Sequence, residues 1–250
     1  MKYPPNDYYQ KNLDKYYQYG KARINRSLRY FHRQRLDAIF TIMNNIPFNE
    51  QESLIVLDAG CGRGANIIQF AKQGIMVIGV DISEEALEQA SSWVKQEFVQ
   101  DWVTLIRGDI TALPFKDDSF DVIISSDVLS VAGDTERGIN IIAKLLKING
   151  ISIIVFPNQF SVFWINVFII QKIANLLGIK IPGNEFERYR YGVIKSLVNK
   201  AGLKIKRTSS VYIIPMLHFS TYNKIEGKLS SKFPFKYLGS HIIIEATNSD

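Results

Sequence analysis

The sequence has few of the residues that usually carry metal or covalent chemistry. It contains one cysteine, Cys61, and three histidines among its 250 residues. A single cysteine excludes an internal disulfide framework and is consistent with a reducing compartment. The histidines, His32, His218 and His241, form no H-E-x-x-H pattern, and no carboxylate cluster stands at metal-ligand spacing. We therefore expect no metal centre.

Long apolar runs are also lacking. The most apolar stretch, residues 160–181, is interrupted by Asn166, Gln171, Lys172 and Asn175. A membrane-spanning helix needs about 18 or more uninterrupted apolar residues, so this stretch is not expected to cross a membrane. The beginning of the chain, MKYPPNDYYQKNLDKYY, has no apolar core of the kind that a secretory signal needs. We expect a cytoplasmic protein.

The charge balance is mildly basic. Thirty Lys and Arg residues stand against 24 Asp and Glu residues, which gives a net charge of +6. This excess favours anionic partners or membrane surfaces. The basic residues are scattered and form no marked patch interleaved with aromatic residues, so nucleic acid is not the expected partner.

Apolar patterning predicts strands that alternate with helices. Such an order is typical of an α/β fold with a doubly wound, mostly parallel sheet, here of seven strands. The last two strands lack a crossover of normal length, which predicts an antiparallel strand at the edge of the sheet. The predicted strands are residues 54–59, 75–80, 102–107, 120–125, 150–157, 203–214 and 240–248, and the predicted helices are residues 21–46, 64–73, 84–96, 135–147 and 191–201.

The pattern divides the chain into an N-terminal arm and a core. Residues 1–50 are predicted to form a helical arm or lid, and residues 51–250 the core, with an apolar insertion at about 158–190. Apolar residues of this insertion follow helical spacing, with lysines nearby. Three roles stay open for it: a buried lid, a helix of a homodimer, or a peripheral membrane contact through residues 160–181. The apolar residues are Phe160, Phe163, Trp164, Val167, Phe168 and Ile170.

A glycine-rich turn follows the first predicted strand of the core, in VLDAGCGRGAN (residues 56–66). Glycine lets the backbone approach a ligand closely and adopts positive φ at little cost. In an open α/β sheet this turn lies at the carboxyl edge, where ligands bind. Tight-turn packing alone would also explain Gly60, Gly62 and Gly64. The glycines by themselves leave both interpretations open.

An acidic residue at the end of the second strand strengthens the ligand interpretation. Asp81 follows Gly60 at the distance at which dinucleotide-binding folds place an acid on ribose hydroxyls. Residues 60–65 also satisfy the relaxed G-x-G-x-x-A pattern, so an NAD(P)-dependent oxidoreductase is an alternative. The spacing of Gly60 and Asp81 does not distinguish such an oxidoreductase from a protein that binds another ligand at this turn.

The segments DAGCGRG, GVDIS and IRGDITALPFKDDSFDVIISSDVL occur in this order between residues 54 and 157. This series resembles the motifs of class I S-adenosylmethionine-dependent methyltransferases, especially the group that acts on small molecules and lipids, including quinone-ring methyltransferases. The resemblance implies a Rossmann-like fold, S-adenosylmethionine as cofactor, and methyl transfer to a small-molecule or lipid-like acceptor. A non-catalytic or nucleic-acid-directed member of the same fold remains a further alternative.

The resemblance also implies roles for the residues of the first two motifs. Gly60, Cys61 and Gly62 would run along the methionine part of the cofactor, and Asp58 would lie near its amino group. Asp81 would hold the ribose diol. A cationic cofactor with hydroxyl and amino donors fits such carboxylates better than a pyrophosphate does.

The later motifs would contact the rest of the cofactor and the acceptor. By resemblance, Ile82 would pack on the adenine, and Asp109 with the backbone of Ile110 would meet the amino edge of the adenine. Ser126 and Asp127 would lie near the sulfonium and the acceptor.

The chemistry itself demands no particular catalytic residue. Methyl transfer from a sulfonium is an in-line displacement, for which alignment and exclusion of water supply much of the catalysis. Many relatives carry Glu-His after the fourth strand, where this chain has Ser130 and Val131. The remaining catalytic candidates are Asp127 and, in the tyrosine-rich arm, Tyr16 and Tyr19. His241 lies in a predicted strand, which favours a structural role.

Overall fold

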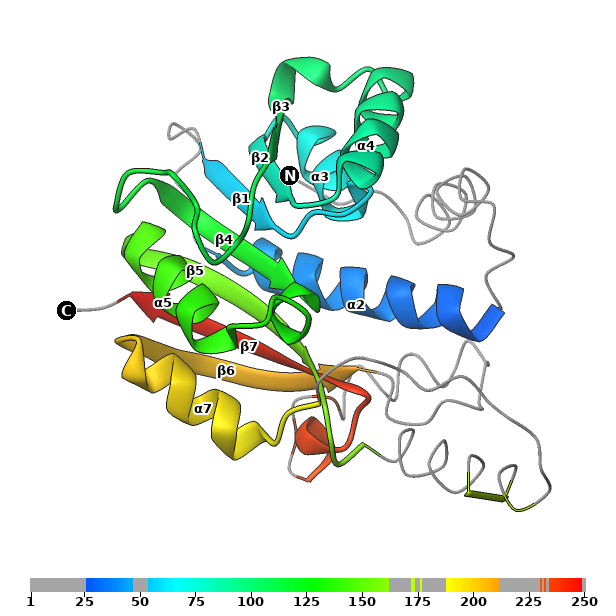
Figure 1. The fold of residues 1–250 in the computed structure, drawn as a ribbon, viewed down its shortest axis with the longest axis vertical. Helices are drawn as coiled ribbons and strands as arrows, with labels where there is room; N and C mark the ends of the chain where they lie inside the picture. The colour runs from blue at the N-terminus through cyan, green and yellow to red at the C-terminus, as the bar shows by residue number, and fades with distance from the viewer. Residues whose placement is uncertain are drawn as a thin grey trace. The chain divides into compact units, whose positions relative to one another are not determined.

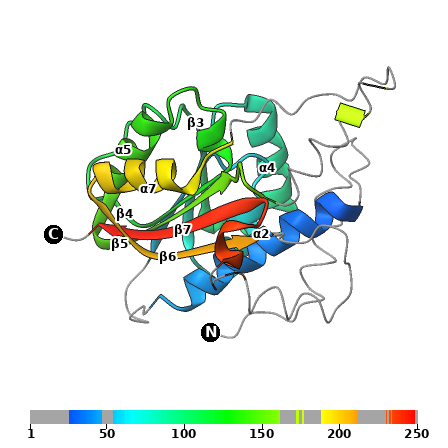
Figure 2. The same ribbon diagram turned by 90° about the horizontal axis from the view of Figure 1, so that it is seen from below.

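The computed structural model describes residues 26–46, 54–161, 172–173, 176, 188–211, 230, 232 and 234–248, with side chains of the first helix from residue 34 onward. These residues group into two compact units, which divide after Gly108. Figure 1 labels the elements, and Figure 2 shows the same ribbon turned by 90°. Tyr16, Tyr19 and most of the insertion at 158–190 lie outside the described residues, so the predictions for them stay predictions.

The first unit repeats strand and helix. Its strands β1, β2 and β3 pair in parallel, β1 with β2 and β2 with β3, as the alternating pattern predicts. The elements are α2 (Arg26–Asn44), β1 (Ile55–Ala59), α3 (Ala65–Ala71), β2 (Met76–Asp81), α4 (Glu84–Gln96), η1 (Gln100–Trp102) and β3 (Val103–Arg107).

Close packing of helices on strands shapes the core of this unit. A Cβ added at Gly79 of β2 would lie 2.2 Å from Cδ1 of Ile67 in α3, so only glycine lets this helix approach the strand so closely. The rings of Phe40 in α2 and Phe70 in α3 lie 4.8 Å apart between centroids, so α2 packs beside α3. Ser83 caps α4 by accepting the amide of Ala86 at 3.2 Å.

The second unit contains the parallel pair β4 and β5 and the two last strands. Strand β7 is antiparallel to both of its partners, β5 and β6, which confirms the predicted antiparallel pairing. Helices α5 and α7 cover the same face of these strands (Figure 2). The elements are β4 (Phe120–Ser126), η2 (Val128–Ser130), α5 (Thr135–Leu145), β5 (Leu146–Pro157), α7 (Tyr191–Lys200), β6 (Leu203–Val211), η3 (Phe235–Tyr237) and β7 (His241–Asn248).

The strands form one seven-stranded sheet, in the order β3-β2-β1-β4-β5-β7-β6. The predicted fold class is therefore confirmed. The largest difference in a boundary concerns residues 146–149: the predicted helix at 135–147 ends at Leu145, and β5, predicted to begin at residue 150, begins directly at Leu146. Leu146 is fully buried and extended, so its side chain belongs to the sheet and not to the helix.

Strand β7 enters the sheet in the direction opposite to that of β5. Its first residue, His241, pairs with Pro157 at the end of β5 and with Val211 at the end of β6. The start of β7 therefore lies at the carboxyl ends of its two neighbours.

Among the described residues, no helix is long and apolar enough to span a membrane.

Candidate functional site

The glycine turn after β1 is joined to the end of β2. The backbone amides of Gly60 and Cys61 both donate to the carbonyl oxygen of Val80, at 2.8 and 2.9 Å. Gly60, Gly62 and Gly64 all have positive φ, of 85°, 51° and 85°. Such φ values are strained for most other residues, so the alternating glycines follow from the path of the chain.

The glycines of the turn serve different purposes. A Cβ added at Gly64 would lie 3.2 Å from Cβ of Ala90, so Gly64 lets the start of α3 pack against α4. A Cβ added at Gly62 would have no atom within 4 Å. Packing therefore explains Gly64, whereas Gly62 presents a bare backbone to open space, which a ligand can approach.

Asp81 is held by the turn and by the start of α4. One carboxylate oxygen, Oδ2, accepts the amide of Gly62 at 2.7 Å, and the other, Oδ1, accepts the amide of Ser83 at 2.9 Å. The side chain is half-buried. Each carboxylate oxygen has a second lone pair, so Asp81 keeps acceptor capacity for donors outside the protein.

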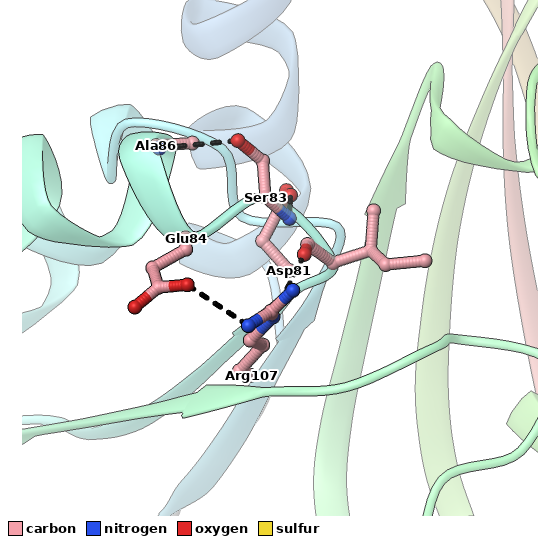
Figure 3. Close-up of polar contacts among 6 residues, drawn as sticks. Asp81, Ser83, Glu84, Ala86 and Arg107 are labelled. Carbon is pink, nitrogen blue, oxygen red and sulfur yellow. Dashed lines mark hydrogen bonds and ion pairs between the residues drawn. The ribbon is translucent and has the colours of Figure 1, made fainter.

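Arg107, which was not among the predicted site residues, braces the segment between β2 and α4. In Figure 3, Arg107 at the end of β3 reaches across to the segment between Asp81 and α4. Its Nε donates to the carbonyl oxygen of Ile82 at 3.3 Å, and its Nη1 lies 2.9 Å from Oε2 of Glu84. The ion pair is exposed, and such pairs contribute about 1 kcal/mol or less. The hydrogen bond from Arg107 orients the backbone of Ile82, whose side chain is 66% exposed.

Asp58 differs from Asp81 in being fully buried in β1. Burial raises its pKa to about 7, although the amide of Asn66 donates to both carboxylate oxygens at 3.3 and 3.2 Å and so opposes the rise. The charge of Arg35 in α2 also lowers the pKa, and the charge of Asp81 raises it. Asp58 therefore changes charge near neutral pH, unlike an ordinary surface carboxylate.

Cys61 contributes its backbone to the turn and keeps its side chain inside. The thiol is buried, and burial, with the charges of Asp58 and Asp81, raises its pKa. A thiol whose pKa is raised in this way is a poor nucleophile. The geometry favours a role for the backbone of Cys61 over one for its sulfur.

In the second unit, Asp109 is exposed and bound to its own turn. Its Oδ1 accepts both the amide and the hydroxyl of Thr111, each at 2.8 Å. These hydrogen bonds hold the pKa of Asp109 below its ordinary value. The side chain of the intervening Ile110 is buried, so it can offer a ligand only its backbone.

The end of β4 carries three consecutive polar side chains. The hydroxyl oxygens of Ser125 and Ser126 are buried and have no hydrogen-bond partner among the described residues. Asp127 follows with a left-handed backbone (φ 65°), and its Oδ1 lies 3.3 Å from Nε2 of His241. The structure thus brings His241, for which the sequence favoured a structural role, to one of the predicted acceptor-side residues.

The chain matches the family described as "Methyltransferase domain" over residues 50–175, just over half of its length. It belongs to this family. The match does not favour the oxidoreductase alternative or the nucleic-acid alternative. It covers every predicted cofactor residue, but it does not test their individual roles.

Relatives of this methyltransferase domain differ in how much of the chain they share. An uncharacterized methyltransferase of Bacillus subtilis is 35% identical over 38% of this chain and 37% of its own length. A ubiquinone biosynthesis O-methyltransferase of Rickettsia conorii is 29% identical over 56% of this chain and 46% of its own length. The chain therefore spans less than half the length of these curated relatives.

Among solved structures, the magnesium protoporphyrin IX methyltransferase of Synechocystis, crystallised with bound SAH, has a similar fold. The TM-score is 0.64 at 23% identity, and the match covers 97% of both chains. At this identity the likeness concerns the fold. Within the described part of this methyltransferase domain, no group of His, Cys, Asp or Glu side chains could hold a metal ion.

Proposed function

We propose that the protein transfers a methyl group from S-adenosylmethionine to a small-molecule acceptor. The observation that carries the proposal is the carboxylate of Asp81, fixed on the glycine turn by the amide of Gly62 at 2.7 Å. In this arrangement the methionine part of the cofactor would lie along Gly60, Cys61 and Gly62. The ribose hydroxyls would donate to Asp81.

The same hydrogen bond argues against a dinucleotide. A pyrophosphate needs the free backbone amides of a glycine turn. Here the amide of Gly62 already donates to the Asp81 carboxylate and is not free for a phosphate. A sulfonium cofactor has no phosphate, and its positive charges and hydroxyl donors suit an acidic site.

The exposed side chain of Ile82 fits an adenine ring. A large apolar side chain that is 66% exposed beside a polar turn gains stability when a flat ring covers it. Arg107 would hold the backbone of this segment in place. Asp109, the backbone of Ile110, and Ser126 remain proposed cofactor contacts in the second unit, by resemblance.

A lipid-like acceptor and peripheral contact with the inner membrane surface are finer parts of the proposal. Their support is the apolar insertion, of which Phe160, Ile173 and Leu176 are described and exposed. Exposed apolar side chains next to lysines favour an interface with anionic lipid. A helix in a homodimer would use the same side chains, and vesicle co-sedimentation with and without anionic lipid distinguishes the two roles.

Calorimetry tests the cofactor. We expect S-adenosylmethionine and S-adenosylhomocysteine to bind, and NAD and NADP not to bind at the same concentrations. A labelled-methyl transfer assay over metabolite and lipid extracts, with identification of the product, then tests the activity. A protein that binds neither sulfonium cofactor nor thioether product would contradict the proposal.

A further inference from the structure

Strand β7 brings an imidazole to the end of β4. His241 is the first residue of β7 and is buried, and its Nε2 lies 3.3 Å from Oδ1 of Asp127. Because β7 runs antiparallel to β5, its start lies where β5 ends, at Pro157. The two residues are far apart in sequence and meet only because the last strand of the chain inserts between β5 and β6.

The backbone around Asp127 is fixed on both sides. Its amide donates to the carbonyl oxygen of Val155 in β5 at 3.1 Å, and its own carbonyl oxygen accepts the hydroxyl of Ser130 at 2.5 Å. Its φ of 65° lies in the left-handed region, which aspartate tolerates better than most residues. These contacts hold Asp127 in one backbone conformation, as a group that must meet a substrate requires.

The other ring nitrogen of His241 is also engaged. Nδ1 lies 3.0 Å from the hydroxyl oxygen of Ser240, and this hydroxyl can donate its one proton to Nδ1. With Nδ1 turned to Ser240, Nε2 is the nitrogen that faces Asp127. A proton on Nε2 stabilises the Asp127 carboxylate, whether the imidazole is neutral or charged.

Two serines directly precede Asp127, as the last residues of β4. The hydroxyls of Ser125 and Ser126 are buried without a hydrogen-bond partner among the described residues. Buried hydroxyls are seldom left without a partner unless a ligand or water supplies it. The end of β4 therefore has a carboxylate beside an imidazole and two hydroxyls with unused hydrogen-bonding capacity.

We propose that Asp127, held by His241, removes the proton from the acceptor, and that the acceptor is methylated on a hydroxyl or amine. This inference rests on the proposed methyl transfer. In the step, a lone pair of the acceptor oxygen or nitrogen forms the bond to the methyl carbon, and the carbon–sulfur bond breaks. Its electron pair remains on sulfur, so the sulfonium becomes a neutral thioether. The acceptor proton passes to the Asp127 carboxylate and later to solvent.

His241 is a positioning residue in this scheme, because it acts through Asp127. Its ring nitrogens face Ser240 and Asp127, so it orients the carboxylate and shares the charge that the proton changes. General-base catalysis by a positioned side chain contributes typically 10²–10⁴-fold. A group that only orients the base contributes less.

The test compares four variants in labelled-methyl transfer from S-adenosylmethionine. The acceptors are catechol, 4-hydroxybenzoate and benzylamine as probes, together with a metabolite and lipid extract. We expect D127N to lower the transfer rate about 100-fold and H241F about 10-fold or more, with the Kd for S-adenosylmethionine within about threefold of wild type. H241Q keeps an N–H that can face the carboxylate and should recover most of the loss.

D121N is the matched control. Asp121 lies near the start of the same strand, and Nζ of Lys147 lies 2.9 Å from its Oδ1. The substitution repeats D127N at the opposite end of β4 and should leave transfer unchanged. Thermal unfolding of each variant separates a loss of the fold from a loss of the proton acceptor.

Nitrogen-15 spectra of the imidazoles give a readout that needs no acceptor. Substitution of His32 and of His218 in turn assigns the three histidines. We expect the Nε2-protonated form of His241, and a change of its nitrogen shifts in D127N but not in D121N. Unchanged nitrogen shifts of His241 in D127N would contradict the contact between Asp127 and His241.

Each further outcome decides between the two proposals. Absence of S-adenosylmethionine binding contradicts the proposed function itself. Binding without methylation of any hydroxyl or amine acceptor, a product methylated on carbon, or wild-type transfer by D127N or H241F overturns the inference about Asp127 and His241 and leaves the cofactor assignment intact.

Discussion

Asp81 in the first unit ends a parallel strand and Asp127 in the second follows one, but different kinds of group contact them. Both oxygens of Asp81 accept backbone amides, from Gly62 and Ser83. Oδ1 of Asp127 instead lies 3.3 Å from Nε2 of His241, in the last strand. Backbone amides carry no titratable proton, whereas an imidazole gains and loses one near neutral pH. The first arrangement suits binding, and the second suits proton transfer.

This contrast extends to the effects expected of variants. In the first unit, Asp58 is buried and Asp81 is held by backbone amides. In the second, Asp127 lies beside the imidazole of His241. Variants in the first unit should therefore change binding and stability, and variants of the pair in the second should change the rate of transfer.

The largest effect is expected from Asp58, through its burial. Its folded pKa is about 7 against an ordinary value of 3.8, so between these values the folded state binds a proton that the unfolded state does not. The contribution of Asp58 to stability is therefore fully present below the unfolded pKa. This contribution, about 4 kcal/mol, is lost as the pH rises toward 7. In D58N this contribution disappears.

Urea unfolding of wild type and D58N at pH 5 and pH 8 measures the contribution of Asp58 to stability. Between these pH values we expect wild type to lose about 2–3 kcal/mol more stability than D58N does. The amide of Asn66 can still donate to an asparagine at position 58, so D58N should fold. Equal pH dependence in the two proteins would mean that Asp58 is charged in the fold at both pH values.

The next largest effect is expected for Asp81 on cofactor affinity. D81N removes the negative charge and one of the two backbone acceptors, which should raise the Kd for S-adenosylmethionine about 10- to 100-fold, or about 1.4–2.7 kcal/mol. Calorimetry measures it. D101N changes an exposed acid of η1 in the same unit and should bind like wild type. If D127N weakens binding as much as D81N does, the division between binding and proton transfer fails.

The contrast also explains what the sequence could predict. The roles at Asp81 depend on residues close together along the chain or joined by one βαβ unit, whose geometry is regular. Strand alternation and the antiparallel end of the sheet follow from local patterns, and the structure confirms them. The predicted helix at 135–147 was wrong at its end because Leu146 is apolar in either element, and burial in the sheet decided it.

The Asp127–His241 pair had no such local signal. His241 stands in an apolar run, HIII, that predicts a strand equally well whether the first side chain is structural or functional. Its position depends on the insertion of β7 between β5 and β6, a long-range register that a single sequence does not encode visibly. Arg107 was missed for a similar reason, since its contacts reach Ile82 and Glu84 on another strand–helix turn.

A smaller effect separates the two glycines that the sequence treated alike. G64A forces a Cβ to 3.2 Å from Ala90 at φ 85° and should cost about 2 kcal/mol of stability, measured by urea unfolding. G62A has free space and φ 51°, so it should cost about 1 kcal/mol. In contrast, G62A should weaken S-adenosylmethionine binding roughly tenfold, because its methyl group occupies the space proposed for the cofactor. Wild-type affinity in G62A would place the cofactor elsewhere.

The smallest effect is expected at Asp109. Hydrogen bonds from the amide and the hydroxyl of Thr111 lower the pKa of Asp109, so this carboxylate stabilises the fold above its ordinary pKa and loses that contribution as pH falls through the lowered one. T111V removes the hydroxyl donor and keeps the amide. The pKa of Asp109 should therefore rise only part of the way to its ordinary value, and stability should fall by about 1 kcal/mol or less.

An NMR titration of the Asp109 carboxyl measures the shift, and T111S, which keeps the hydroxyl, is the control. If the pKa in T111V stays at the wild-type value, the amide alone accounts for the shift, and Asp109 is held as Asp81 is, by backbone.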